Sequence, residues 1–272
     1  MKKLQKIKEE TVRAILPRWD HVKEPYHATI CAFPFSYSVG RTIIGFCRGS
    51  GIEPENSHIL IVGAAGGRDF NWLTGFGYAV DLLDLGHHNW SQSTYIGDVC
   101  RAETWKQIKT KYDLVVMCDV LEHLPEDFAA LKHARSVLKG EGRLFLSIPY
   151  KHDLEVTHVR SYSEVTIERL LTLAGYKVIW KRDRPGMFEA FPRLLNMLNY
   201  GSAVLMPTTH VGSKLLQFLL ELEYQINERT CSLYRVFGRS PQKGLTLAAK
   251  PENSGLREDY VAINREMFIA QD

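Results

Sequence analysis

The sequence predicts an α/β protein whose core is a doubly wound, seven-stranded and mostly parallel sheet. From Ser57 onward, short apolar runs alternate with helical patterns, and the chain shows no internal repeat or low-complexity segment. Strands and helices in alternation form βαβ units, whose crossovers place helices on both faces of a parallel sheet. The chain has 272 residues, 45% of them hydrophobic, so it can bury one large core of this kind.

Strands are predicted where the apolar runs are short. His58–Val62 is apolar after its first residue, which is typical of a strand buried on both faces. The last strand follows a long connection. The predicted strands cover residues 58–62, 78–83, 94–96, 113–118, 143–148, 176–180 and 244–249.

Helices are predicted where apolar residues recur every three or four positions. Pro125 is a favourable first helical residue, and Glu126 and Asp127 after it face the positive end of the helix dipole. Ser163 is expected to cap the next helix, which Gly175 ends. The predicted helices cover residues 4–16, 39–47, 68–75, 103–110, 125–138 and 163–175.

These elements divide the chain into three sections. Residues 1–56 are predicted to form an N-terminal helical cap on the substrate side, residues 57–250 the α/β domain, and residues 251–272 a polar tail. Residues 185–240, before the last strand, carry two helical patterns and are interpreted as an insertion over the sheet edge or the ligand site.

Composition and charge exclude several classes of protein. The formal net charge is +3, from 34 Lys and Arg against 31 Asp and Glu, which is too balanced for a dedicated nucleic-acid binder. The five cysteines are scattered without a Cys-x-x-Cys pair, so we expect a reducing compartment and neither a zinc site nor a disulfide framework. His87 and His88 are interpreted as surface residues, and no metal site is expected. No signal peptide and no apolar stretch of about 20 residues is found, so a cytoplasmic location is predicted.

A loop of small residues, Gly63–Gly67, follows the first predicted strand. Ligands of open parallel sheets bind at the carboxyl ends of the strands. Small residues there let the backbone approach a ligand, and the helix that follows exposes N–H groups to an anion. A tight turn without a ligand is the alternative interpretation.

Acidic residues follow the next three strands. Asp84 stands 21 positions after Gly63, the spacing at which a carboxylate commonly accepts the hydroxyls of a ribose. A solvated acid at a strand end is the alternative interpretation. Asp98 can accept a hydrogen bond from the exocyclic amine of a purine, while Val99 offers the ring an apolar face. The fourth strand is followed by Asp119-Val120-Leu121-Glu122-His123-Leu124-Pro125.

Five segments in this order resemble the class I S-adenosylmethionine-dependent methyltransferases, most of all the small-molecule branch that includes the ubiquinone-pathway O-methyltransferases. The most specific segment runs from Asp119 to Pro125 and is followed by a helix and by Leu138-Lys139-Gly140-Glu141-Gly142-Arg143-Leu144. The resemblance extends over about residues 57–181, with a weaker echo at 244–251. The segments are residues 59–69, 80–85, 97–99, 118–125 and 138–149.

This resemblance implies the Rossmann-like methyltransferase fold, an enzyme, and S-adenosylmethionine as its cofactor. The sequence departs from the family at Ile61, where an acid is common, and at Ala65, where the middle glycine is common. The cofactor contacts that the resemblance implies are Gly63, Ala65 and Gly67 for the methionine part, Asp84 for the ribose, Asp98 and Val99 for the adenine, Asp119 and Val120 near the amino acid moiety, and in addition Ala64 and Leu85.

A nicotinamide-dependent dehydrogenase is the rival interpretation of the loop. That fingerprint has glycine at the sixth position, where it lets helix and strand pack closely, and this chain has Arg68 there. A seventh strand after a long connection also suits the methyltransferase topology, in which that strand enters antiparallel.

Two histidines after the fifth strand are the candidates for catalysis. Methyl transfer needs the acceptor atom and the methyl carbon held in line in a dry site, and a base helps when the acceptor is a hydroxyl. Histidine titrates near neutrality. His158, in a segment that packs beside the active site in members of the family, and then His152 are the predicted base or substrate anchor. In the alternative, His158 and Arg160 only hold the loop; His123 is expected to shape the cofactor pocket.

The predicted function is O-methylation of a small molecule, a saccharide or a lipid-linked glycan intermediate. An aromatic, quinone-like or natural-product acceptor is the first alternative, and a non-catalytic cofactor-binding module of the same fold is the second. Tyr26, Phe33, Phe35 and Tyr37 could line the acceptor or pack in the core. An apolar stripe over residues 215–226 could form a core or a homodimer seam, or make peripheral contact with a membrane. No nucleic-acid partner and no transmembrane segment are expected.

Overall fold

The computed structural model describes residues 37–64, 68–87, 94–149, 157–185, 222, 225–226 and 242–252 of the protein. Several predictions fall on other parts of the chain. The helix over 4–16, the aromatic residues from Tyr26 to Phe35, most of the 185–240 insertion and the tail after Glu252 lie outside the described residues.

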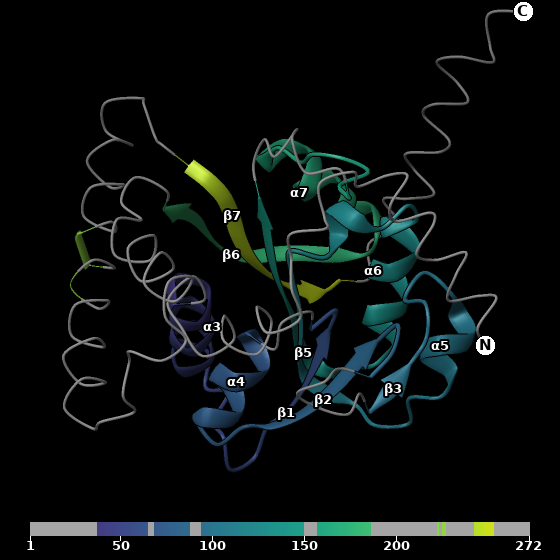
Figure 1. The fold of residues 1–272 in the computed structure, drawn as a ribbon, viewed down its shortest axis with the longest axis horizontal. Helices are drawn as coiled ribbons and strands as arrows, with labels where there is room; N and C mark the ends of the chain where they lie inside the picture. Colours follow the sequence, from purple (N-terminus) through teal and green to yellow (C-terminus); the bar gives the residue numbers. More distant parts are fainter. Residues whose placement is uncertain are drawn as a thin grey trace, which may run out of the picture.

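The seven predicted strands are all present. They are β1 (His58–Val62), β2 (Ala79–Asp84), β3 (Tyr95–Ile96), β4 (Tyr112–Cys118), β5 (Leu138–Pro149), β6 (Tyr176–Pro185) and β7 (Gln242–Pro251). They form one sheet in the order β3-β2-β1-β4-β5-β7-β6 (Figure 1). The strands from β3 to β5 pair in parallel, and β7 enters antiparallel between β5 and β6. The predicted fold class is confirmed.

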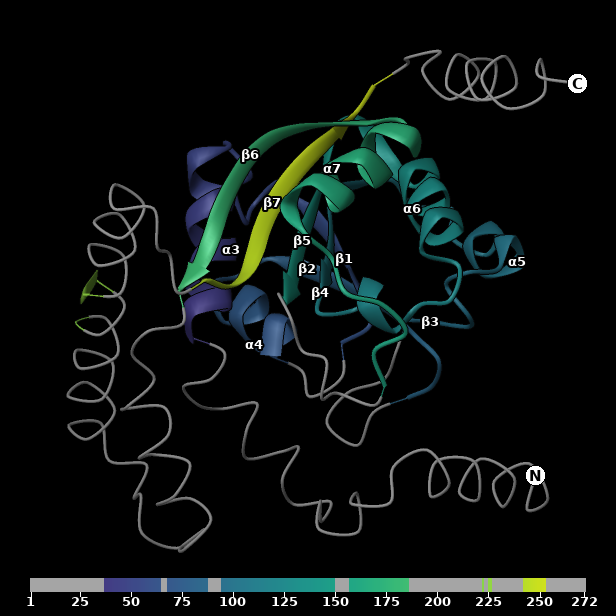
Figure 2. The same cartoon turned by 90° about the horizontal axis from the view of Figure 1, so that it is seen from above.

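Helices cover both faces of this sheet. They are α3 (Tyr37–Gly49), α4 (Arg68–Gly75), α5 (Ala102–Lys106), the short 3-10 helix η3 (Leu121–His123), α6 (Asp127–Ser136) and α7 (Glu164–Leu173). α3 and α4 lie on one face, and α5, α6 and α7 lie on the other (Figures 1 and 2). This is the doubly wound arrangement that the alternation of elements predicts, although α5 is shorter than the predicted 103–110.

Side chains of the central strands alternate between two apolar cores, one on each face of the sheet. In β1, Ile59 and Ile61 pack in the core that α3 and α4 cover, whereas Leu60 and Val62 pack in the opposite core. All four side chains are fully buried, which explains why β1 reads as a continuous apolar run.

The boundary between α6 and β5 differs from the prediction, which continued the helix to residue 138. α6 ends at Ser136, and Leu138 already pairs with Tyr112 of β4. The Tyr112 N–H donates a 2.9 Å hydrogen bond to Val137 O, and this bond draws the chain into the sheet directly after the helix. A Cβ on Gly142 would stand 2.8 Å from Tyr112 O. The glycines at 140 and 142 therefore belong to the strand.

The sheet reverses its winding between β1 and β4, which are neighbours in space. At such a switch point the connections after the two strands leave toward opposite faces and open a crevice at the carboxyl ends. Gly63 follows β1, Asp119 follows β4, and Asp84 ends β2. The predicted cofactor residues thus lie at the edge where an open α/β sheet binds its ligand.

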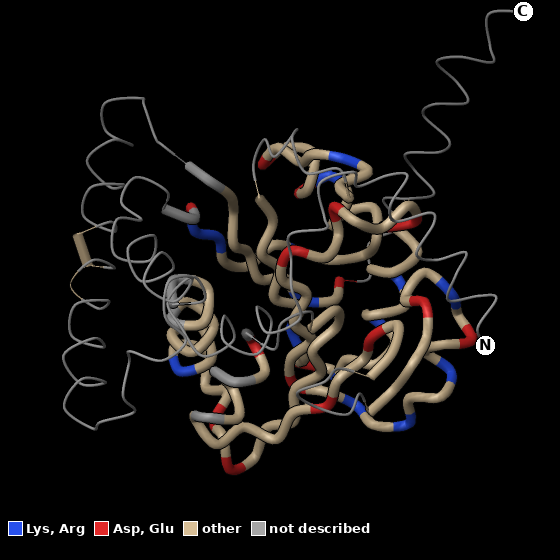
Figure 3. Tube along the Cα trace, viewed as in Figure 1, with Lys and Arg blue, Asp and Glu red and all other residues tan. Residues whose placement is uncertain are grey.

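Charged positions of both signs are interspersed over the described part of the molecule (Figure 3). This distribution agrees with the small net charge of +3. Among the described residues, no helix is both long enough and apolar enough to cross a membrane.

Candidate active site

Gly63 shapes the loop at the carboxyl end of β1. Its φ of +70° lies in the left-handed region, which glycine adopts at low cost. Its N–H donates to Leu83 O of β2 at 3.0 Å, and a Cβ built on it would stand 2.7 Å from Val120 Cγ2. The chain therefore turns sharply between β2 and the loop after β4. Ala65 and Gly67, the next predicted contacts, lie outside the described residues.

Asp84 joins the carboxyl ends of β1 and β2. Its Oδ2 accepts a hydrogen bond from the Ala64 N–H at 2.9 Å, and its Oδ1 accepts one from the Leu85 N–H at 2.7 Å. Both oxygens of the carboxylate are thus held at the strand ends. Asp84 is therefore in direct contact with the loop of small residues through Ala64.

Asp98 and Val99 form the turn between β3 and α5. Asp98 Oδ1 accepts a hydrogen bond from the Cys100 N–H at 2.8 Å, and its Oδ2 lies 3.6 Å from Arg101 Nε. Val99 is buried, and its carbonyl oxygen accepts a 2.7 Å hydrogen bond from Trp105 Nε1. The Asp98 carboxylate therefore shapes the turn on one side and is exposed to solvent on the other.

Asp119 occupies a strained turn at the end of β4. Its φ of +55° makes it the one non-glycine residue with positive φ in the described part of the chain. Aspartate tolerates this conformation better than most residues, and such strain is concentrated at functional sites. The Asp119 N–H donates to Ser147 O of β5 at 2.7 Å. Val120 follows and is buried against Gly63.

The structure brings these predicted contacts to one edge of the sheet. Gly63 meets Val120, Ala64 bonds to Asp84, and the Gly97 N–H donates to Asp84 O at 2.9 Å, which holds the β3 turn beside the end of β2. The edge runs in the order β3, β2, β1 and β4. The described members of the predicted set thus follow one another along this edge of the sheet.

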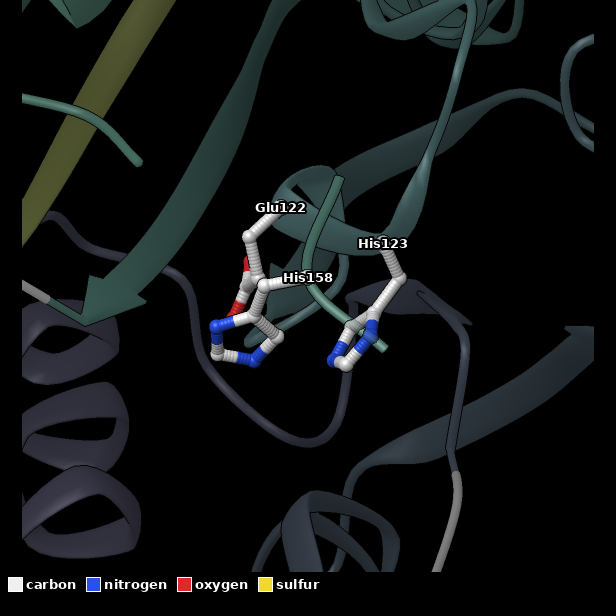
Figure 4. Close-up of side chains that lie close together, drawn as sticks. All are labelled: Glu122, His123 and His158. Carbon is white, nitrogen blue, oxygen red and sulfur yellow. The ribbon is translucent and has the colours of Figure 1, made fainter. Parts of the chain in front are cut away.

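Three titratable side chains gather beyond Val120. Glu122 and His123 belong to η3, and His158 comes from the segment after β5. Their ligating atoms all lie within 4.8 Å of one another, and the two imidazole rings meet edge to face with centroids 4.6 Å apart. Figure 4 shows the three side chains directed toward one another. His152, the second candidate base, lies outside the described residues.

The segment that carries His158 is fastened to the loop after β4. The Val159 N–H donates to Glu122 O at 2.8 Å, and the Arg160 guanidinium lies 2.7 Å from Asp127 Oδ2. Arg160 thus holds the loop, as the alternative interpretation predicts. The ring of His158 points instead toward His123 and Glu122 (Figure 4).

Tyr162 strengthens the same junction from inside the protein. Its hydroxyl donates to Asp127 Oδ2 at 2.6 Å, and both side chains are buried. Burial, together with this hydrogen bond to a carboxylate, raises the pKa of Tyr162 well above its usual value. The hydroxyl therefore stays protonated and keeps donating at physiological pH.

Glu122 has no predicted role, and the contact between His123 and His158 was not predicted. The available signal was the pair of adjacent polar residues, Glu122 and His123, in a loop that follows a buried strand. The third member lies in another loop and becomes recognisable only through the contacts that fold the two loops together.

Comparisons with known proteins bear on the family and the fold. Residues 48–180 match the family described as methyltransferase domain, and no curated protein matches the sequence. An S-adenosylmethionine-dependent methyltransferase from Clostridium acetobutylicum is similar in structure, with a TM-score of 0.50, 13% identity, and coverage of 90% of this chain and 98% of that chain. An S-adenosylmethionine-dependent methyltransferase from Archaeoglobus fulgidus has a TM-score of 0.49 at 14% identity, with coverage of 78% of this chain and 94% of that chain.

A third similar structure was solved with ligands. It is the 1,6-didemethyltoxoflavin-N1-methyltransferase from Burkholderia thailandensis with 1,6-didemethyltoxoflavin and S-adenosylhomocysteine bound. Its TM-score is 0.49 at 14% identity, with coverage of 79% of this chain and 78% of that chain. At 13% identity, the likeness to the Clostridium acetobutylicum structure shows a shared fold alone.

Proposed function

We propose that this chain is a class I S-adenosylmethionine-dependent methyltransferase that methylates an oxygen of a small molecule, a saccharide or a lipid-linked glycan intermediate; the match of residues 48–180 to a methyltransferase domain supports this. One observation carries the proposal. The Asp84 carboxylate, bonded to the Ala64 N–H at 2.9 Å, stands at the joined ends of β1 and β2, where an adenosyl group would lie.

The cofactor contacts follow from position along the sheet edge. Asp84 would accept the ribose hydroxyls, and Asp98 with Val99 would flank the adenine. The Gly63–Gly67 loop would hold the methionine part beside Asp119. Bound there, the cofactor supplies a methyl carbon activated by a positively charged sulfur. These residues bind and orient it and keep water from the reacting atoms.

The acceptor side of the site is polar, which supports a hydroxylated substrate. A hydroxyl acceptor needs partners that hold its oxygen and take its proton, and imidazole can do both near neutral pH. His158 is half-buried beside His123 and the buried Glu122. We place His158 next to the acceptor oxygen, with His152 as the second candidate.

Isothermal titration calorimetry with S-adenosylhomocysteine tests the cofactor site. The wild-type protein should bind in the nanomolar to micromolar range. Asp84→Ala should lose more than about tenfold in affinity, because each hydrogen bond to a charged group contributes about 1.5–3 kcal/mol. Glu103→Ala removes an exposed acid of α5 and should bind as wild type does. Equal binding by the Asp84 variant contradicts the assignment.

Methyl transfer from an isotopically labelled donor tests the acceptor. Hydroxylated saccharides and lipid-linked glycans form one panel, and quinols and other aromatic hydroxyl compounds form the second. Turnover of the first panel supports the proposal, and turnover of the second alone replaces the acceptor with the aromatic alternative. Cofactor binding without transfer to either panel favours the non-catalytic module.

We also propose that the enzyme works in the cytoplasm. Cys47, Cys100 and Cys118, the described cysteines, are buried and are not in a disulfide. Burial raises the pKa of the Cys47 thiol to about 12, so this side chain behaves as a core residue. The predictions of a homodimer and of peripheral membrane contact concern the 185–240 insertion, of which the structure describes residues 222, 225 and 226.

A further inference from the structure

We propose that Glu122, His123 and His158 bind one divalent transition-metal ion, which holds and activates the acceptor oxygen; this inference rests on the proposed function. The three residues offer one carboxylate oxygen and two imidazole nitrogens, all within 4.8 Å of one another. Ligands that stand about 2.0–2.2 Å from an ion lie at most about 4.4 Å from each other. Small rotations of the side chains therefore complete the site.

The hydrogen bond of His123 prepares its ring to ligate. His123 Nδ1 lies 3.2 Å from Thr157 O, and a carbonyl oxygen can only accept, so the proton of the neutral ring stands on Nδ1. The lone pair is then on Nε2. A backbone carbonyl on the second ring nitrogen is the usual way in which proteins orient a metal-binding histidine.

His158 is held in place from both sides along the chain. Thr157 before it contacts His123, and Val159 after it donates a 2.8 Å hydrogen bond to Glu122 O. One residue further on, Arg160 binds the loop of Glu122 and His123 through Pro125 O at 2.7 Å. The two loops are thus joined at the point where the three ligating atoms meet, and the cluster is preorganised rather than a chance approach of mobile side chains.

The donor set selects the kind of ion. Two imidazoles and one carboxylate suit Mn²⁺, Fe²⁺, Co²⁺, Ni²⁺ or Zn²⁺, whereas Mg²⁺ and Ca²⁺ prefer oxygen ligands. Glu122 is 1% exposed, and an ion beside it offsets the cost of burying its charge. His123 is exposed and His158 half-buried, so the cluster opens toward solvent on the side of the imidazoles. Three protein ligands leave coordination positions for an incoming substrate.

The position of the cluster gives the ion a role in the reaction. It directly follows Val120, which packs against Gly63 in the proposed cofactor loop. A hydroxyl bound to a divalent ion loses its proton to solvent more readily than a free hydroxyl, as metal-bound water does. The oxygen electron pair then forms the bond to the methyl carbon while the carbon–sulfur bond breaks, and that pair remains on the sulfur of neutral S-adenosylhomocysteine. No further reactant is required.

The open positions also define a substrate class. An acceptor with two adjacent oxygens, such as the vicinal diol of a saccharide, can fill two coordination positions and be fixed by chelation. The histidines then act as ligands, and the ion takes the place of a general base. The metal site differs from the prediction of none, which rested on the scattered cysteines and on His87 and His88 as surface residues.

Metal binding to the full-length protein tests this inference without a need for turnover. The protein is treated with a chelator, and Mn²⁺ is titrated with detection by calorimetry and by electron paramagnetic resonance. We expect one ion per chain, and at least tenfold weaker binding in His123→Asn and in His158→Asn. Glu122→Gln should act in the same direction. Because Glu122 is buried, circular dichroism should first show that the Glu122→Gln variant folds. If it does not fold, the His123→Asn variant tests the site instead, since His123 is exposed.

His133→Asn is the matched control, since this half-buried histidine packs on Trp105 of α5, outside the cluster. It should bind Mn²⁺ as wild type does. Wild-type protein without a stoichiometric ion, or cluster variants with wild-type affinity, would overturn the inference. S-adenosylhomocysteine binding by the same chelated protein separates the two proposals. If the protein binds the cofactor product but not Mn²⁺, the metal site alone is contradicted. If it binds Mn²⁺ but not the cofactor product, the cofactor site alone is contradicted.

Discussion

Gly63 and Val120 are in contact at the switch point of the sheet: a Cβ built on Gly63 would stand 2.7 Å from Val120 Cγ2 and 3.2 Å from Val120 Cγ1. One residue follows β1 and the other lies in the loop after β4. The two loops can lie this close together because Gly63 has no side chain at the place where Val120 packs. A side chain at position 63 would overlap the methyl groups of Val120, so one of the two residues would have to shift.

Gly63→Ala should lower the free energy of unfolding by about 2–4 kcal/mol, because it combines a left-handed φ with a steric overlap. Gly51→Ala is the matched control. Gly51 has a φ of +68°, but a Cβ there would have no neighbour within 4 Å. The control should lose only about 1–2 kcal/mol. Urea denaturation followed by circular dichroism measures both values.

A second substitution isolates the contact itself. Adding Val120→Ala to Gly63→Ala should recover part of the lost stability, since it removes the methyl groups that overlap. A loss at Gly63 no larger than the loss at Gly51 would contradict the contact, and so would a purely additive double variant.

Tyr162→Phe should lower the free energy of unfolding by about 1.5–3 kcal/mol, because the hydroxyl donates to the buried carboxylate of Asp127. Tyr176→Phe provides the comparison. Its hydroxyl is also buried, but it donates to a neutral carbonyl, Leu131 O, at 3.0 Å, so about 0.5–1.5 kcal/mol is expected. Equal losses would show that the charge of Asp127 adds nothing.

The same substitution should loosen the segment that carries His158. In Tyr162→Phe the amide of Val159, bonded to Glu122 O, should exchange hydrogen faster than in wild type. In Tyr176→Phe it should exchange at the wild-type rate. Unchanged protection of this amide in Tyr162→Phe would mean that the bond from Tyr162 to Asp127 does not help to hold the segment.

The strands and most helices could be predicted because local sequence decides them. β1 is apolar on both faces, and helix α7 is capped by Ser163, whose side chain accepts from the Thr166 N–H at 3.2 Å. The border between α6 and β5 could not be predicted in the same way. It depends on the bond from the Tyr112 N–H to Val137 O, which links residues far apart in the chain.

A similar distinction applies to the candidate site. In a parallel sheet the end of each strand lies at a known edge, so the approach of Asp84 to Gly63 and Ala64 could be predicted from topology and spacing. The meeting of Glu122, His123 and His158 could not. It depends on how the 157–160 segment folds back onto η3, and no periodic pattern encodes that path.

His133 should make stability depend on pH. Burial lowers the pKa of its imidazole below the ordinary value of 6.5. Between the two pKa values the unfolded chain binds more protons than the folded protein, so stability rises with pH there. This contribution is fully present above about pH 6.5 and is lost as the pH falls through the lowered pKa.

His133→Gln should therefore flatten the pH dependence of the unfolding free energy. Urea denaturation at a series of pH values from about 7.5 down to 5 measures the slope in wild type and variant. The difference between the two curves isolates His133 from the other titrating groups. Parallel curves over this window would contradict the role assigned to its burial.

Asp98 has two roles that two substitutions can separate. Asp98→Asn keeps the Oδ1 that accepts the Cys100 N–H at 2.8 Å and removes the negative charge, whereas Asp98→Ala removes both. Stability should change by less than about 0.5 kcal/mol in the Asn variant and fall by about 1 kcal/mol in the Ala variant. Both variants should bind S-adenosylhomocysteine about tenfold more weakly, because the charged acceptor for the adenine amine is lost.

A modified ligand makes this last test specific. S-inosylhomocysteine carries an oxygen where the adenine has its exocyclic amine, so the exocyclic position offers Asp98 no hydrogen to accept. Asp98→Asn should then bind this ligand at least as well as wild type does, since an amide can donate where a carboxylate repels. Calorimetry with both ligands and both proteins gives the coupling free energy between residue and amine. Equal losses for the two ligands would place Asp98 away from the adenine and leave it only the turn before α5.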